Sequence, residues 1–140
     1  MIYLTRCYYL SALHRLHNPQ LSLAENQVIY GKCNYAPGHG HNYAVEVTVA
    51  GEPAAESGMV VNLAELDAFV ARELLARFHL ADLNTDVPSF RQHVPTSENF
   101  CLEIFRLLQQ GFRAARIERV RLLETSRNAF EYAAEKGDSG

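Results

Sequence analysis

The residues that could do chemistry are concentrated in the stretch GKCNYAPGHGHNY, residues 31–43. It contains one thiol, Cys33, and two imidazoles, His39 and His41, which are separated by a single glycine. Successive side chains of a strand point to opposite faces, so we expect His39 and His41 to project from the same face. Imidazole is a common zinc ligand in proteins. The stretch therefore predicts a zinc site with a thiol nearby.

A catalytic zinc ion takes three protein ligands and keeps a fourth position open. His14 is the best candidate for the third ligand, because it follows the first predicted strand, which should pair with the strand that carries His39 and His41. The alternatives are His17, His79 and His93. The same residues could instead have a purely structural role, with the thiol as a packed side chain and the glycines and prolines in an ordinary turn.

Hydrophobic periodicity indicates the elements that must position these side chains. Residues 2–10 are rich in tyrosine and aliphatic side chains, and residues 42–50 alternate strictly, which is typical of strands. Residues 117–124 and 128–133 predict two more strands, which are joined by a hairpin turn. Residues 15–37 are polar and mixed, and we expect them to form a long loop.

Two helices are predicted between these pairs of strands. Residues 63–78 carry apolar side chains at helical spacing, with Asn62 as the capping residue. The second helix begins near Thr96 or Ser97 and ends at Gly111. The order predicts an α+β fold with a four-stranded antiparallel sheet and two helices on one face. The edges of such a sheet must be covered or paired, and we expect them to pair between subunits.

Composition narrows the classes of protein. The length of 140 residues predicts a single domain, residues 1–140, and 48% hydrophobic with 21% charged residues is ordinary for a globular chain. A net charge of −3 gives no sign of a nucleic-acid partner, and no apolar run is long enough to span a membrane. Three cysteines without an export signal predict reduced thiols and a cytoplasmic protein.

Several segments, in this order, resemble the 6-pyruvoyl-tetrahydropterin synthase family. They are YYLSALHRL, LSLAENQVIYGKCNYAPGHGHNY, SGMVVNLAELDAF, DVPSF, PTSENF and LLETSRNAFEY, and the resemblance extends from about Tyr3 to Tyr132. It implies the tunnelling fold, in which subunits join their sheets into a barrel, as a homo-oligomer that is usually a hexamer of two stacked trimers. It also implies a zinc-dependent lyase that acts on a small-molecule pterin, 7,8-dihydroneopterin triphosphate, and eliminates triphosphate to give 6-pyruvoyl-tetrahydropterin.

The same resemblance implies a role for each candidate residue. The family's three zinc ligands match His14, His39 and His41. Its catalytic cysteine matches Cys33, which would act as a base once nearby positive charge lowers the pKa of the thiol. Its pterin-anchoring glutamate matches Glu124, and Thr96 and Ser97 are expected near that carboxylate at the start of the second helix.

One segment departs from the family pattern. The family typically has an Asp-His pair after the first helix, where this chain has His79 and Leu80. Either His79 supplies the imidazole from a shifted position, paired with Asp82 if the helix continues, or the general-acid function is lost. Because Cys33 is retained, we predict that His79 is its partial substitute partner, donated by a neighbouring subunit.

Two alternative functions stay open. The 6-carboxy-tetrahydropterin synthases of queuosine biosynthesis share the fold, the zinc and the substrate, but tend to have a shorter gap than the five residues found here between the cysteine and the His-Gly-His sequence. A further branch cleaves the substrate side chain and has glutamate in place of cysteine, so Cys33 argues against it. The missing Asp-His pair also fits a zinc- and pterin-binding protein with little turnover.

Overall fold

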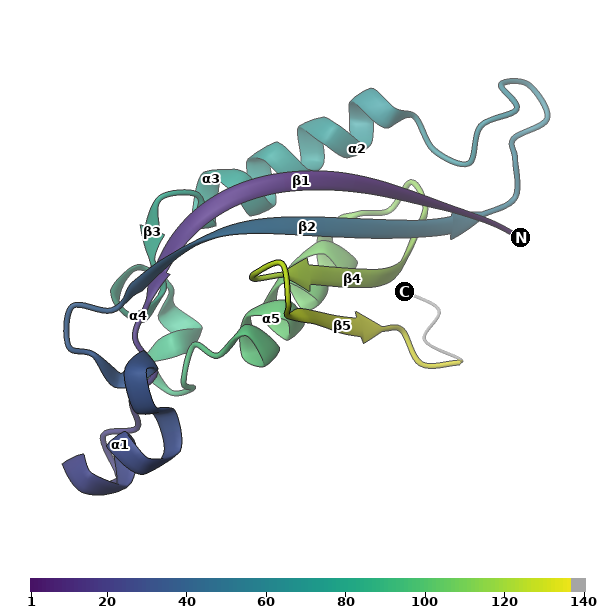
Figure 1. The fold of residues 1–140 in the computed structure, drawn as a ribbon. Helices are drawn as coiled ribbons and strands as arrows, with labels where there is room; N and C mark the ends of the chain where they lie inside the picture. The colour runs from purple at the N-terminus through teal and green to yellow at the C-terminus, as the bar shows by residue number, and fades with distance from the viewer. Residues whose placement is uncertain (137–140) are drawn as a thin grey trace.

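One sheet and one layer of helices make up the computed structural model, which describes residues 1–136 (Figure 1). The strands are β1 (Ile2–His14), β2 (His39–Gly51), β3 (Ala81–Asp82), β4 (Arg116–Leu123) and β5 (Ala129–Ala133). The α-helices are α1 (Leu23–Tyr30), α2 (Leu63–Val70), α3 (Ala76–Phe78), α4 (Leu83–Asp86) and α5 (Ser97–Gly111). The remaining helical turns are η1 (Gly31–Asn34), η2 (Ala71–Leu75) and η3 (Pro88–Arg91).

The sheet confirms the predicted α+β class but not the predicted strand number. Its order is β3-β1-β2-β4-β5, so the prediction of a four-stranded, wholly antiparallel sheet is wrong. The fifth strand, β3, pairs with β1 in parallel at Ala12 and Leu13. Because β3 has only two residues, no alternation of hydrophobic side chains could reveal it. The four predicted strands do pair in an antiparallel manner.

The first two strands are longer than predicted at the end that carries the histidines. Their pairing continues until His14 lies opposite His39, and Ala12 lies opposite His41. Directly opposed residues share a face of the sheet, and so do residues two apart. The long pairing therefore places His14 and His41 on the same face, which is the face covered by helices.

The two predicted helices are present. Residues 63–78 are helical throughout as α2, the π-helical turn η2 and α3. Asn62 caps α2 by accepting the N–H of Ala64, and Thr96 caps α5 by accepting the N–H of Asn99. No helix within residues 1–136 has the length and apolar character needed to cross a membrane.

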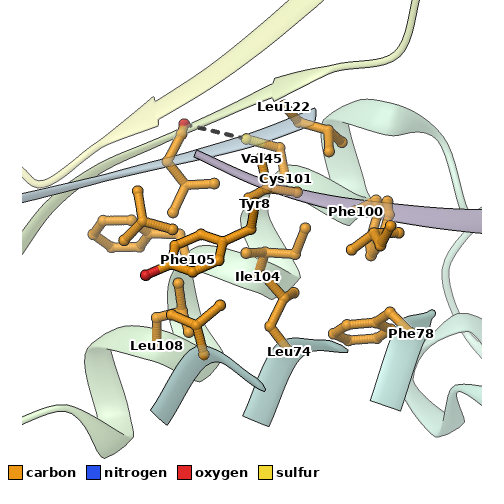
Figure 2. Close-up of a cluster of buried hydrophobic side chains, with 14 of the residues drawn as sticks. Tyr8, Val45, Leu74, Phe78, Phe100, Cys101, Ile104, Phe105, Leu108 and Leu122 are labelled. Carbon is orange, nitrogen blue, oxygen red and sulfur yellow. Dashed lines mark hydrogen bonds between the residues drawn. The ribbon is translucent and has the colours of Figure 1, made fainter. Parts of the chain in front are cut away.

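The hydrophobic core lies between these helices and one face of the sheet (Figure 2). The strict alternation of β2 is confirmed, since its inward side chains are at most 1% exposed: Tyr43, Val45, Val47 and Val49. They meet side chains of α5 such as Phe100 and Ile104, which are fully buried. Burial of each such side chain contributes roughly 1.5–3 kcal/mol. This packing fixes the height of α5 above β2.

The prediction of a loop over residues 15–37 is wrong in its middle. Here α1 begins after Ser22, whose hydroxyl accepts the N–H of Glu25 in a capping box, and η1 follows it. Leu23 and Val28 of α1 are 73% and 86% exposed, so the helix has no buried apolar stripe that would announce it. Figure 1 shows α1 beyond the end of the sheet where β1 ends and β2 begins.

Candidate metal and substrate site

Three titratable side chains meet at the end of the sheet. They are His14 at the end of β1, His41 in β2 and Glu124 directly after β4. Each offers one ligand atom, and these atoms all lie within 4.8 Å of one another. Imidazole nitrogen and carboxylate oxygen are both ligands that zinc accepts. The three side chains therefore form a group that could hold a metal ion.

His14 is prepared for such a role by its surroundings. Its side chain is buried, and its Nδ1 lies 2.8 Å from the carbonyl oxygen of Pro95. A carbonyl only accepts hydrogen bonds, so Nδ1 carries the proton and Nε2 keeps a lone pair for a metal. Burial lowers the pKa of His14, and this effect outweighs the Pro95 carbonyl, which raises it. The imidazole is thus held neutral, as metal binding requires.

The N-terminus of α5 positions the carboxylate of Glu124. Ser97, the first residue of α5, is only 3% exposed, and its hydroxyl hydrogen-bonds Oε2 of Glu124. The other oxygen, Oε1, lies 3.6 Å from Nε2 of His41. Thr96 precedes Ser97 as the capping residue of the same helix. The structure thus brings Ser97 and Glu124 into contact beside the two histidines, and their role in substrate binding stays a prediction.

Tyr43 belongs to this neighbourhood although its position in an alternating strand indicated only a core residue. Its hydroxyl is buried and has no hydrogen-bond partner within residues 1–136, which is rare for a buried polar group. Its ring lies 5.6 Å from the ring of His41, centroid to centroid. Burial raises the pKa of Tyr43, and the charge of Glu124 raises it further; these two effects outweigh the nearby Ser97 side chain, which lowers it, so the hydroxyl keeps its proton. The signal in the sequence is its place two residues after His41.

His39 is not grouped with the other two histidines. Its Nε2 lies 2.6 Å from the carbonyl oxygen of Lys32, so Nε2 carries a proton and Nδ1 keeps a lone pair. The backbone of His39 lies opposite His14 in the sheet. Its role as the third zinc ligand stays a prediction. The alternative ligands also lie outside the group of potential metal ligands: His17, His79 and His93.

Cys33 lies in η1, on the segment that leads into β2. Its thiol is free and half-buried, and it is not among the grouped ligands. Its carbonyl oxygen accepts the N–H of Leu16 at 2.9 Å. This bond ties the turn that carries the thiol to the segment directly after His14. The predicted catalytic role of Cys33 stays a prediction.

The helix ends before His79, so the pairing of His79 with Asp82 that a continuing helix would bring about does not form. Nδ1 of His79 instead accepts the backbone N–H of Ser11 at 3.1 Å. Asp82 caps α4 by accepting the N–H of Asn84. Between them Leu80 has a φ of 63°, a left-handed conformation that is uncommon for leucine. His79 is exposed at this turn, and its catalytic role stays a prediction.

Comparison with known proteins agrees with the resemblance. Residues 3–135 match the family described as 6-pyruvoyl tetrahydropterin synthase. A 6-pyruvoyl tetrahydrobiopterin synthase of Poecilia reticulata is 40% identical over 133 residues, which are 95% of this chain and 90% of that protein. The solved structure of Caenorhabditis elegans 6-pyruvoyl tetrahydropterin synthase has a TM-score of 0.91 and 37% identity, and covers 96% of both chains. A protein of Archaeoglobus fulgidus, provisionally named 6-carboxy-5,6,7,8-tetrahydropterin synthase, is 38% identical over 86 residues, 61% of this chain and 67% of that protein.

Proposed function

The chain belongs to the 6-pyruvoyl tetrahydropterin synthase family, and we propose that it converts 7,8-dihydroneopterin triphosphate into 6-pyruvoyl-tetrahydropterin in the cytoplasm. The observation that carries the proposal is the group of His14, His41 and Glu124 beside the first residue of α5. It joins potential metal ligands to a fixed carboxylate at one end of the sheet. Three free cysteines are in keeping with a reducing compartment.

Zinc is the proposed metal, with His14, His39 and His41 as its ligands. The donor chemistry fits, because His14 is neutral and buried and keeps Nε2 free, while His39 keeps Nδ1 free. Bound zinc would supply Lewis acidity that polarises the hydroxyl groups of the substrate side chain. Glu124 competes for the third position, since its carboxylate lies in the same group as His14 and His41.

We assign Glu124 to the pterin ring. A carboxylate can accept two parallel hydrogen bonds from the amino and ring N–H groups of a pterin. Ser97 holds one oxygen of this carboxylate, which fixes its orientation. The first N–H groups of a helix lack partners within the helix, so Thr96 and Ser97 also bring donors for acceptor atoms of the ligand.

Cys33 is the proposed base. Its thiolate takes a proton from the substrate side chain, triphosphate leaves with the bonding electrons, and proton shifts then give the pyruvoyl product. No external oxidant or reductant is consumed. His79 of a neighbouring subunit is the proposed partial partner of this thiol.

Two other functions have specific support. Similarity to the archaeal protein favours formation of a 6-carboxy product, and His79 with Leu80 in place of Asp-His favours binding without turnover. Incubation of the zinc-loaded protein with 7,8-dihydroneopterin triphosphate, followed by mass spectrometry, distinguishes the proposed function from these two alternatives. We expect the mass of the 6-pyruvoyl product. A 6-carboxy mass selects the first alternative, and bound but unchanged substrate selects the second.

We propose that the protein assembles as a hexamer of two trimers. The strand β5 forms one edge of the sheet, and β3 covers β1 at only two positions, Ala12 and Leu13. Along β1, the side chains of Tyr3 and Tyr9 are 60% and 74% exposed. Uncovered strand edges favour pairing with another chain. Light scattering should give the mass of a hexamer, and a stable monomer at micromolar concentration would contradict the proposal.

A further inference from the structure

A cavity of about 590 Å³ opens between α1, η1 and the segment that follows β1. Its lining includes two cationic side chains, Arg15 and Lys32, together with the polar side chains of Gln27 and Tyr35. None of these four residues was a candidate for the site above. The cavity is nevertheless lined by residues that directly neighbour site residues in the chain.

Chain positions and two contacts place part of the cavity lining next to His39. Arg15 directly follows His14, and Lys32 directly precedes Cys33. The carbonyl oxygen of Lys32 lies 2.6 Å from Nε2 of His39. The ring of Tyr35 lies 6.1 Å from the ring of His39, centroid to centroid. The cavity therefore adjoins His39, one of the proposed zinc ligands, on the side of η1.

Arg15 is held in place by several hydrogen bonds. The side chain of Asn84 brackets its backbone, accepting from its N–H at 2.7 Å and donating to its carbonyl oxygen at 2.8 Å. Its Nε donates to the carbonyl oxygen of Asn34 at 2.9 Å. Within residues 1–136 the two terminal nitrogens of the guanidinium have no hydrogen-bond partner. A half-buried, oriented guanidinium with free donors is suited to bind an anion.

The charge of this pair is not neutralised within the chain. In the part of the chain that the structure describes, neither Arg15 nor Lys32 forms an ion pair. Six other arginines do pair with carboxylates: Arg6, Arg72, Arg77, Arg116, Arg119 and Arg121. Two cations that line one cavity without a carboxylate are suited to bind a polyanion.

We infer that Arg15 and Lys32 bind the triphosphate group of the substrate. The inference rests on the proposed function, which supplies a pterin with a triphosphate on its side chain. A pterin ring anchored by Glu124 and a side chain near Cys33 would leave the triphosphate on the η1 side. Arg15 and Lys32 then hold the leaving group by charge-assisted hydrogen bonds and act on affinity for the phosphorylated ligand alone.

The test compares two oxidised, fluorescent ligands, neopterin triphosphate and neopterin, in fluorescence titrations of the zinc-loaded protein. We expect wild-type protein to bind the triphosphate form more tightly. Arg15→Gln and Lys32→Gln should each weaken binding of that form roughly 10- to 100-fold, the value of a charge-assisted hydrogen bond, and leave binding of neopterin unchanged. The dependence of triphosphate affinity on salt should also become weaker in both variants.

Arg91→Gln is the matched control. Arg91 is an exposed arginine that lines a separate cavity of about 340 Å³, and no hydrogen bond or ion pair holds its side chain within residues 1–136. The Arg91→Gln protein should bind neopterin triphosphate and neopterin as tightly as wild-type protein does. Lys32 is exposed, so Lys32→Gln remains informative if Arg15→Gln disturbs the fold.

The inference is overturned if Lys32→Gln and Arg15→Gln weaken the binding of both ligands equally, or if they weaken the binding of neither ligand. It is also overturned if wild-type protein does not prefer the triphosphate form. Failure of the proposed function gives a different result, namely no turnover of 7,8-dihydroneopterin triphosphate. The preference between the two ligands and its loss in the variants can still be measured in that case.

Discussion

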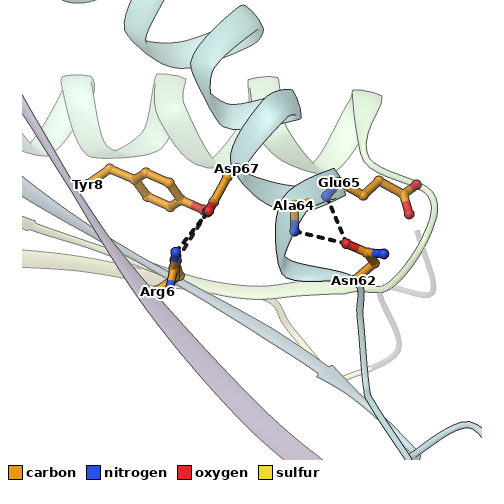
Figure 3. A network of polar contacts seen from close by, with 6 residues as sticks. All are labelled: Arg6, Tyr8, Asn62, Ala64, Glu65 and Asp67. Carbon is orange, nitrogen blue, oxygen red and sulfur yellow. Dashed lines mark hydrogen bonds and ion pairs between the residues drawn. The ribbon is translucent and has the colours of Figure 1, made fainter. Parts of the chain in front are cut away.

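The strand β1 carries two polar clusters that use the same kinds of residue in different ways. Near its start, Asp67 of α2 accepts hydrogen bonds from Arg6 at 3.1 and 2.9 Å and from the hydroxyl of Tyr8 at 2.7 Å (Figure 3). At its end, His14 lies close to His41 and Glu124, and these three residues form the second cluster. The first cluster fastens α2 to the sheet, and every charge in it has a partner.

The second cluster is left with unused bonding capacity. Lone pairs of His14 and of the Glu124 carboxylate are available, and the buried hydroxyl of Tyr43 has no partner within residues 1–136. Buried polar groups are normally satisfied, so this unused capacity is available to a bound ion or ligand. The two carboxylates thus differ in how far their hydrogen-bonding capacity is filled, rather than in the chemistry of their side chains.

The largest expected effect is the loss of metal from the second cluster alone. Purified protein should contain about one zinc per chain, and the His39→Ala, His41→Ala double variant should contain almost none. Asp67→Asn should retain its zinc, because the first cluster has no capacity for one. Metal analysis of the three proteins checks this. Full zinc occupancy in the double variant would sink the assignment.

Single variants sharpen the same measurement. If His39 is the third ligand, His39→Ala should lower zinc affinity while Glu124→Ala leaves it intact. The opposite result would make Glu124 the ligand that completes the group with His14 and His41.

The next largest expected effect is the loss of turnover in Cys33→Ala. Removal of a positioned base typically lowers the rate roughly 10²–10⁴-fold, and we expect a loss of turnover in this range. Cys7→Ala is the matched control, because Cys7 is an exposed thiol on β1 and lies outside the second cluster. Initial rates with 7,8-dihydroneopterin triphosphate measure both. Equal rates for Cys33→Ala and wild-type protein would refute a catalytic thiol.

Glu124→Ala contrasts the two carboxylates directly. Loss of charge-assisted hydrogen bonds to the pterin should raise the dissociation constant of neopterin roughly tenfold or more, while zinc remains bound. Asp67→Ala should leave that constant unchanged, because its oxygens are already occupied by Arg6 and Tyr8. Fluorescence titration measures both constants. An unchanged value for Glu124→Ala would refute its role as pterin anchor.

His79→Ala should have a smaller effect on turnover than Cys33→Ala. Nδ1 of His79 is occupied by the N–H of Ser11, so only Nε2 is left to exchange a proton with a neighbouring subunit. We expect a loss of less than about 100-fold, the lower bound for a well-positioned acid or base. If turnover is unchanged, Cys33 keeps its role and the shifted-histidine hypothesis fails.

Many of the strands and helices that position the second cluster could be predicted from the sequence. The alternation of β2 and the cap at Thr96 belong to single elements, where period and capping residue are local signals. The proximity of His14 and His41 could also be predicted, because the end of β1 pairs with the start of β2 in an antiparallel pair.

The remaining features depend on contacts that no local pattern contains. The strand β3 is defined by its pairing with Ala12 and Leu13, and its own sequence is too short to show a period. Ser97 was predicted near Glu124, but their hydrogen bond requires α5 to sit at a height set by core packing. The side chain of His39 turns to the carbonyl of Lys32, which no spacing rule specifies.

The smallest expected effect concerns pH and the first cluster. The hydrogen bonds from Arg6 and Tyr8 lower the pKa of Asp67, so its folded-state pKa lies below the unfolded value of about 3.9. The unfolded chain therefore binds the proton first as pH falls. The stability that Asp67 contributes is complete above the unfolded pKa and is lost as pH falls through the folded pKa.

Asp67→Asn removes this titration, so its unfolding temperature should fall less than that of wild-type protein between pH 6 and pH 3. The two proteins should differ most near neutral pH and converge in acid. The pair is exposed, so the difference should also shrink at high salt. Glu56→Gln, at an exposed glutamate without hydrogen bonds or ion pairs in the described part of the chain, is the control and should follow wild-type protein at every pH. Parallel curves for Asp67→Asn and wild-type protein would show that the first cluster holds α2 by packing, with no contribution from the charge of Asp67.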